Sequence, residues 1–421
     1  MTAGETLQAI EATFRIERNR LIAGLARLVR DIDRAEELAQ DALVIALSEW
    51  PRSGVPANPG AWLMTAAKRR AIDEIRRDAM RTRKHQEIAR ELDGAFEDVT
   101  EAIEASMSDD LGDERLGLLF TACHPMLSAD ARAALTLRVV GGLTTDEIAR
   151  AFLVPEPTIA QRIVRAKRTL ADEHVPFELP SRAERAGRVA SVLEVIYLVF
   201  NEGYSATAGD DWTRPALCEE AMRLARILAQ LSQDTAEVHG LVALLEIQAS
   251  RMRARLDSEG KPILLMAQDR SRWDQLLIGR GLAALARAEQ IEDEPGPYQL
   301  QAAIAACHAR ARTPEATDWD RIVALYGELM TCLPSPVVEL NRAVAVSMAS
   351  GPAAALLLVD GLVTDGHLAR YHLLHAARGD LLARLDRHAE ARTEFERAAA
   401  MTANEREKAL LFERARDARS R

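Results

Sequence analysis

Apolar residues recur at steps of three and four along almost the whole chain, and this spacing limits the possible folds more than any other feature of the sequence. The segment 33–49 is typical. Asp33 and Glu36 form a capping-box-like pair at its start, and Trp50-Pro51 begins the loop after it. Its apolar positions make one helical face: Ala35, Leu38, Ala42 and Ile45. Pro and Gly interrupt the pattern at intervals, as they do between helices. Aromatic residues make up only 4% of the chain, so a packed interior must rely on Ala, Leu, Val and Ile. We therefore expect an all-α protein, and 421 residues suggest about three domains.

Charge is distributed unevenly along the chain. The formal net charge is −10, but residues 91–115 contain ten acidic residues and one arginine, whereas residues 1–90 are net positive by three. A segment so acidic and so poor in apolar residues is typical of a solvated linker. The low overall pI therefore does not exclude nucleic-acid binding, because local basic patches set the affinity for phosphate.

The cysteine content and hydropathy exclude several classes of protein. The chain has four cysteines and no pair with the spacing of a metal site, and we interpret Cys123 as a core residue and His124 as a turn residue. No uncharged apolar run reaches the ~20 residues that span a bilayer, and the N-terminus lacks the order of a signal peptide. We expect neither a metal nor another cofactor, and we expect a cytoplasmic protein that is not bound to a membrane.

The segment 142–170 has the pattern of a helix-turn-helix. Thr144 and Glu147 form a capping box before a short helix, and Pro157 suits the first turn of the next helix. That second helix buries its apolar face and leaves a polar, basic outer face that can enter a major groove. The candidate DNA-binding residues of this segment are Thr144, Thr158, Gln161, Arg162, Arg165, Lys167 and Arg168. A helical hairpin with a merely solvated charged face is the alternative interpretation.

A second basic segment lies near the N-terminus. The helix expected over 61–81 begins with an aromatic residue, Trp62, and continues with a run of basic side chains. Basic residues can follow a phosphate backbone, and an aromatic ring can stack on an unpaired base. The candidate residues are Trp62, Lys68, Arg69, Arg70, Arg76 and Arg77. The alternative is a solvated helix with intrahelical ion pairs and a core tryptophan.

Together these segments resemble the extracytoplasmic-function sigma factors of the sigma-70 family. Residues 10–81 resemble region 2, through DRAEELAQDA at 33–42 and AWL and RRAIDEIRR at 61–63 and 69–77. Residues 116–172 resemble region 4, through GLTTDEIA at 142–149 and RAKRTL at 165–170. The two regions occur in the right order around an acidic linker, which is more specific than either string alone.

The resemblance implies a division of labour among the helices. Region 2 would dock on the β′ clamp helices of core RNA polymerase and recognise the −10 element, whereas region 4 would read the −35 element and lie at the β flap. The implied polymerase contacts are Glu36, Glu37, Leu38, Gln40 and Asp41. Lys68-Arg69-Arg70 stands where the family often has Arg-Asn, which leaves the −10 preference open. The implied function is promoter-specific initiation by an alternative sigma factor that is not itself an enzyme.

The chain continues for about 240 residues beyond region 4, and these also have a helical pattern. Gly379, Ala391, Phe395 and Ala398 have the spacing of one tetratricopeptide-like unit near 371–404. The extension resembles the C-terminal domain of one subgroup of these sigma factors, through NEGY at 201–204, DRSRWD at 269–274, GPYQLQAAI at 296–304 and ELNRAV at 339–344. We expect a regulatory domain with a protein or peptide partner. The predicted domains are 1–90, the linker 91–115, 116–175 and 176–421.

Other functions stay open at this point. Glu202, Asp210, Asp211, His239 and Asp269 would form a catalytic pocket only if the fold brought them together. A helix-turn-helix regulator with a helical sensor domain would explain residues 116–421 but not the strings at 33–42 and 61–77. A pure scaffold of helical repeats would need no basic patches. The sequence also predicts turns at 201–204 and 209–212.

Overall fold

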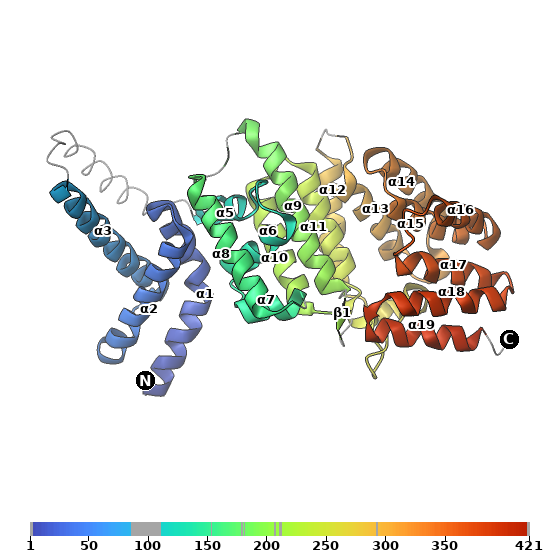
Figure 1. Cartoon of the computed structure of the whole chain (residues 1–421), viewed down its shortest axis with the longest axis horizontal. Coiled ribbons are helices and arrows are strands. Elements are labelled where there is room, and N and C mark those ends of the chain that lie inside the picture. The colour runs from blue at the N-terminus through green and yellow to red at the C-terminus, as the bar shows by residue number, and fades with distance from the viewer. Residues whose placement is uncertain are drawn as a thin grey trace. The chain divides into compact units, whose positions relative to one another are not determined.

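The computed structural model describes residues 3–85, 111–152, 154–177, 180, 182–205, 208–209, 213–291 and 294–418. Regular structure in these residues is almost entirely α-helical, which confirms the predicted all-α class (Figure 1). The chain divides into two compact units, of which unit 1 comprises residues 1–150 and 154–195 and unit 2 comprises 151–153 and 196–421. Residues 91–110 of the predicted acidic linker lie outside the described residues.

Unit 1 begins with three long helices that pack on one another: α1 (Ala3–Val29), α2 (Ile32–Ser53) and α3 (Pro59–His85). The predicted capping pair of Asp33 and Glu36 is wrong, because Asp31 is the N-cap and its carboxylate accepts a hydrogen bond from the amide of Arg34 at 2.9 Å. The predicted break at Trp50-Pro51 is also wrong. Helix α2 continues through Pro51, which removes one backbone donor near the end of the helix, and its last residue, Ser53, is followed by the C-cap Gly54, whose φ is +85°.

Four shorter helices complete the described part of the region that resembles region 4: α5 (Leu111–Ala122), α6 (Ala129–Val139), α7 (Thr145–Phe152) and α8 (Glu156–Asp172). Helix α5 begins within the last residues of the predicted linker. The predicted capping box is confirmed, because the amide of Glu147 donates to Thr144 Oγ1 at 3.2 Å and the amide of Thr144 donates to Glu147 Oε2 at 2.7 Å. The predicted apolar face of α8 is buried at Ile159, Ile163, Ala166 and Leu170. This packing positions the opposite face of α8 toward solvent.

Helix α9 (Arg182–Tyr204) is shared between the two units, because its residues up to Val195 belong to unit 1. Within unit 1, Ser191 Oγ donates to the carbonyl of Cys123 at 2.8 Å, and Arg132 pairs with Glu194 at 3.0 Å. The first part of α9 therefore covers the helices of the region-4-like segment. The structural division at residue 195 lies beyond residue 175, where the predicted boundary falls.

Unit 2 is a succession of helices in which each helix from α10 to α19 packs against the next, the arrangement of helical-repeat proteins. These helices are α10 (Pro215–Leu231), α11 (Ala236–Ala249), α12 (Gln275–Glu289), α13 (Pro297–Arg310), α14 (Trp319–Cys332), α15 (Pro336–Ala349), α16 (Pro352–Asp365), α17 (His372–Arg384), α18 (His388–Met401) and α19 (Glu405–Asp417). A parallel pair of two-residue strands, β1 (Ala208–Gly209) and β2 (Ala403–Asn404), joins the loop after α9 to the loop before α19. Short 3₁₀ turns η1 (Met252–Ala254), η2 (Leu265–Ala267), η3 (Arg270–Arg272) and η4 (Pro314–Ala316) fill connections.

Two glycines allow close approach between helices in unit 2. The turn predicted at 201–204 is helical, and an added Cβ at Gly203 would lie 2.8 Å from the backbone nitrogen of Cys218. Glycine is therefore needed there for contact with α10 rather than for a turn. At Gly379 a Cβ would lie 2.8 Å from the ring of Phe395, which is 1% exposed. The second predicted turn, at 209–212, lies largely outside the described residues.

Candidate nucleic-acid interface

Helix α3 carries the basic residues of the region-2-like segment on its accessible side. Leu63, Ala67 and Ala71 are buried against the neighbouring helices, so the intervening positions face outward. Among the predicted basic residues, Lys68 is half-buried. The others are exposed: Arg69, Arg70, Arg76 and Arg77. The helix therefore presents cationic side chains along about two turns, which suits contact with a phosphate backbone.

A pocket of about 550 Å³ lies between α2 and α3 and is partly aromatic. Its lining residues are Ile45, Glu49, Ala61, Trp62, Thr65, Ala66, Arg69, Arg70, Asp73 and Arg77. The ring of Trp62 packs edge-to-face on that of Trp50, with 5.3 Å between ring centroids, and Trp50 is 1% exposed. Trp62 is thus held by a buried partner while part of its ring stays accessible. An aromatic wall surrounded by guanidinium groups can receive a flat, unpaired base.

Two ion pairs tie α3 to α2 at the edge of this surface. Arg70 Nε lies 2.5 Å from Asp41 Oδ2, and Arg34 pairs with Glu74. Asp41 is a predicted polymerase contact and Arg70 a predicted DNA contact, so the structure brings together one member of each set. The guanidinium of Arg70 is therefore positioned by α2 and is less available to phosphate than those of Arg69 and Arg77.

Helix α8 presents a separate exposed stripe. Gln161 and Arg165 are exposed and one helical turn apart, and Arg168 follows with 81% of its side chain exposed. Thr158 is half-buried at the start of the same stripe. Arg162 lies beside it and pairs with Asp130 at 3.1 Å. This stripe has the donors and acceptors that contact base edges and phosphates in a major groove.

Lys167 lies on the other side of α8. It is 8% exposed, and its ammonium group lies 2.7 Å from Asp33 Oδ1 and 2.6 Å from Glu36 Oε2. The burial of Lys167 could have been predicted from the helical spacing, because residue 167 is four positions after the buried Ile163. In this structure Lys167 therefore contacts α2 and does not share the exposed stripe.

Glu36 is the centre of a cluster of ion pairs at this contact. It is bound by Lys167, by Arg18 of α1 at 2.6 Å and by Arg138 of α6 at 3.5 Å. Burial lowers the pKa of Arg18, and the charge of Glu36 opposes that shift. Three cations around one largely buried carboxylate hold α2, a predicted polymerase-binding helix, against the region-4-like helices.

The other predicted polymerase contacts on α2 differ in exposure. Leu38 is 1% exposed and packs in the helical bundle, whereas Glu37 and Gln40 face solvent. The sequence interpretation missed Val44 and Leu47, which are 62% and 38% exposed. They follow Gln40 at steps of four and three residues and so extend the same face. Large apolar side chains exposed in a row with polar ones are typical of a protein-binding surface.

The carboxylates and histidine of the catalytic alternative make local contacts. Glu202 pairs with Arg214, His239 Nε2 lies 3.0 Å from the carbonyl of Gln233, and Asp269 accepts from the amide of Ser271 at 2.9 Å. Asp210 and Asp211 lie outside the described residues. Cys123 is buried as expected, and burial raises the pKa of its thiol to about 12.

Comparison with known proteins finds three family matches along the chain. Residues 14–81 match Sigma-70 region 2, residues 118–170 match Sigma-70 region 4, and residues 188–289 match a family of unknown function, DUF6596. No solved structure matches the chain. Among the described residues, no helix combines the length and the apolarity needed to cross a membrane.

Some curated relatives match only part of the chain, and another matches nearly all of it. An uncharacterized protein of Rhizobium meliloti is 45% identical over 94% of this chain and 92% of its own length. The ECF RNA polymerase sigma factor SigK of Mycobacterium tuberculosis is 30% identical over 40% of this chain and 87% of its own length. SigK of Mycobacterium ulcerans is 30% identical over 35% of this chain and 75% of its own length. The region 2 match accounts for the strings at 33–42 and 61–77, which a simple helix-turn-helix regulator would leave unexplained. The chain belongs to the ECF sigma factors of the sigma-70 family, which direct transcription initiation and are not an enzyme family.

Proposed function

We propose that this sigma factor binds core RNA polymerase through α2, captures an unpaired promoter base beside Trp62, and reads the −35 element with the exposed stripe of α8. The observation that carries the proposal is the coexistence of two separate DNA-suited surfaces on regions 2 and 4 of one chain. One is an aromatic pocket with three arginines, and the other is a Gln/Arg stripe on a capped helix-turn-helix. The chemistry is binding and strand separation, and the polymerase is the enzyme. The site of action is then the cytoplasm, with the β′ clamp helices facing α2 and the β flap facing region 4.

The polymerase-binding face of α2 is testable with a substitution that leaves its packing intact. Val44→Glu places a charge on an exposed position, so the helix stays folded while a docked partner would have to bury that charge. We expect about a tenfold loss of affinity for core polymerase, or about 1.4 kcal/mol, which is somewhat below the ~2 kcal/mol of an interface hot spot. Fluorescence anisotropy of the labelled protein titrated with core enzyme measures it.

The matched control is Leu357→Glu, which also puts a charge on an exposed apolar position but lies in α16 of unit 2. It is expected to leave core affinity unchanged. Equal affinity of the Val44→Glu variant and the unmodified protein would remove α2 from the proposed polymerase interface.

We also propose that the ion pairs of Lys167 with Asp33 and Glu36 act as a latch that competes with polymerase for α2. Replacing Lys167 with glutamine removes the cation but keeps a side chain of similar length. Because the closed contact is weakened, core polymerase should bind tighter, on the order of fivefold. The measurement is the same titration, with circular dichroism to show that the helices persist.

Arg168→Gln is the control for the latch, because it removes a neighbouring cation that is 81% exposed. The latch is refuted if both variants bind core polymerase with the same affinity as the unmodified protein.

For unit 2 we propose a regulatory role, supported by its helical-repeat packing, which usually presents a binding surface to a protein or peptide. A truncation should end after Val195, because residues 182–195 of α9 belong to unit 1. We expect the truncated protein to use the same start sites with a transcript yield changed by about fivefold or more, the usual size of coupling between sites. Multi-round transcription with core polymerase measures the yield, and an unchanged yield under all conditions tested would refute regulation by unit 2.

A further inference from the structure

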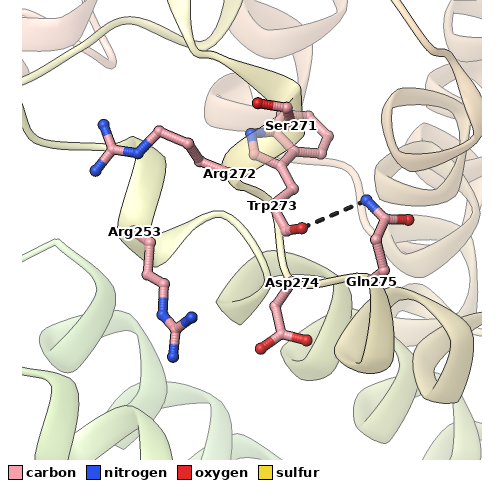
Figure 2. Close-up of a pocket in the computed structure, with 6 residues that line it drawn as sticks. All are labelled: Arg253, Ser271, Arg272, Trp273, Asp274 and Gln275. Carbon is pink, nitrogen blue, oxygen red and sulfur yellow. Dashed lines mark hydrogen bonds between the residues drawn. The ribbon is translucent and has the colours of Figure 1, made fainter.

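A second pocket, of about 610 Å³, lies in unit 2 and shares no residue with the surfaces assigned to DNA (Figure 2). It is formed by the turns η1 and η3 and the start of α12. Its lining residues are Arg253, Ser271, Arg272, Trp273, Asp274 and Gln275. Figure 2 shows that Arg253 and Arg272 come from separate turns. The volume lies in the range of small-molecule sites.

The pocket lies in a segment with unusually many arginines. Residues 250–275 contain six basic and four acidic residues, so the segment is net positive by two. Within the part of the chain that the structure describes, neither Arg253 nor Arg272 makes an ion pair or a hydrogen bond through its side chain. Asp274, the carboxylate of the pocket, caps α12 by accepting from the amides of Leu276 at 3.0 Å and Leu277 at 3.1 Å. Hydrogen bonds from Ser271 and, to a smaller extent, the charge of Arg272 lower the pKa of Asp269. Since neither pocket guanidinium group forms an ion pair with a described residue, both are accessible to an anion.

The arginines behind the pocket wall are bound to uncharged oxygens. Arg270 donates to the carbonyls of His308 at 2.8 Å and Ala311 at 2.6 Å, and Arg251 donates to the hydroxyl of Tyr204 at 2.7 Å. Carbonyl and hydroxyl oxygens satisfy the donors but do not cancel the positive charge. The guanidinium groups of Arg251 and Arg270 thus add positive potential behind the pocket, which the charge of Glu315 partly offsets at Arg270.

The pKa values of ionisable groups around the pocket are shifted in part by this positive charge. Burial, together with the charges of Arg251 and Arg270, lowers the pKa of His308 to about 4, so its ring is neutral at physiological pH. Burial also lowers the pKa of Arg270; the charge of Glu315 opposes that shift, and the neighbouring Arg251 adds to it. Cations that oppose one another in this way are stabilised by an added anion.

The shape of the wall is fixed by Trp273, which is 3% exposed. The guanidinium carbons of Arg270 and Arg251 lie 5.0 Å and 5.8 Å from its ring centroid, within cation–π range. Trp273 connects η3 to α12, so its packing holds Arg272 on one side and Asp274 on the other. The backbone that carries Arg272 and Asp274 is therefore anchored by a buried side chain.

We propose that this pocket binds a small oxyanion ligand, a carboxylate or a phosphate compound, through the guanidinium groups of Arg253 and Arg272. The fork of each guanidinium matches the two oxygens of such a group. A site of this kind would give the sigma factor a small-molecule input on unit 2, and the binding itself does not depend on the proposed DNA and polymerase contacts.

The test is isothermal titration calorimetry on the full chain with inorganic phosphate and with citrate as separate probes, at constant ionic strength maintained with sodium chloride. We expect saturable one-site binding of at least one probe. The double variant Arg253→Gln/Arg272→Gln should weaken that binding at least about tenfold, because charge-assisted hydrogen bonds are lost. Binding of phosphate would indicate a phosphate site, and binding of citrate would indicate a carboxylate site.

The control is Arg392→Gln, which removes an exposed arginine from α18 of the same unit and should leave the affinity unchanged. The proposal is overturned if neither probe binds, or if the double variant binds as tightly as the unmodified protein. It is also overturned if only a polyglutamate peptide saturates the protein, because the surface would then dock an acidic protein segment. Circular dichroism of each variant checks that the fold is retained.

Discussion

Replacing Gln161 and Arg165 together with alanine is expected to lower transcription from promoters with a −35 element by at least about 30-fold, since each base contact is worth about 1–3 kcal/mol. Both side chains are exposed on α8, and the apolar face of the helix is on the opposite side. The substitutions therefore remove contacts to DNA without opening the core. Run-off transcription with core polymerase on matched templates, with and without the −35 element, measures the loss.

Two comparisons make this result specific. Arg392→Ala removes an exposed arginine far along the chain in unit 2 and should have no effect. Arg168→Ala, near the end of α8, should weaken binding to all sequences alike, as loss of a phosphate contact does. If the double variant loses the same activity on templates that lack the −35 element, α8 is not the reading helix.

Replacing Trp62 with alanine is expected to lower initiation by about 5- to 150-fold, because stacking of one base on an aromatic side chain is worth about 1–3 kcal/mol. The loss should appear in strand opening. Binding to duplex −35 DNA should be unchanged, because α8 lies outside the pocket between α2 and α3. Permanganate reactivity of unpaired thymines at the start site measures opening, and a gel shift measures duplex binding.

Trp62→Phe is the conservative comparison for this experiment. Phenylalanine keeps a ring that can pack edge-on against Trp50 and stack on a base, so it should restore most of the opening. If the phenylalanine variant is as defective as the alanine variant, stacking is not the contribution of Trp62. If the alanine variant opens promoters normally, the pocket between α2 and α3 does not capture a base.

Local sequence patterns predicted the elements of the helix-turn-helix well. Thr144 and Glu147 are three residues apart, and a capping box needs no information beyond that spacing. The N-cap of α2 was harder to predict, because the carboxylates of Asp31 and Asp33 can both accept a hydrogen bond from a backbone amide. The choice is made by backbone conformation, with Arg30 in the left-handed region at φ +54° and Asp31 extended.

Contacts between distant segments could not be predicted from those patterns. The helical spacing placed Lys167 beside the buried stripe, but only the fold shows that Glu36, 131 positions earlier, is its partner. Residues 201–204 have the composition of a turn, but Gly203 lies in a helix and is needed for the close approach of α10. The pocket of Arg253 and Arg272 likewise depends on two turns that the sequence separates.

Genome-wide run-off transcription tests the central claim most directly, because no promoter has to be chosen in advance. Core polymerase is incubated with fragmented genomic DNA, with and without the purified full-length protein, and the 5′ ends of the transcripts are sequenced. We predict a set of start sites that appears only when the protein is present and that shares paired −35 and −10 sequences. Failure of the protein to associate with core polymerase, together with identical transcripts in both reactions, would contradict a sigma factor.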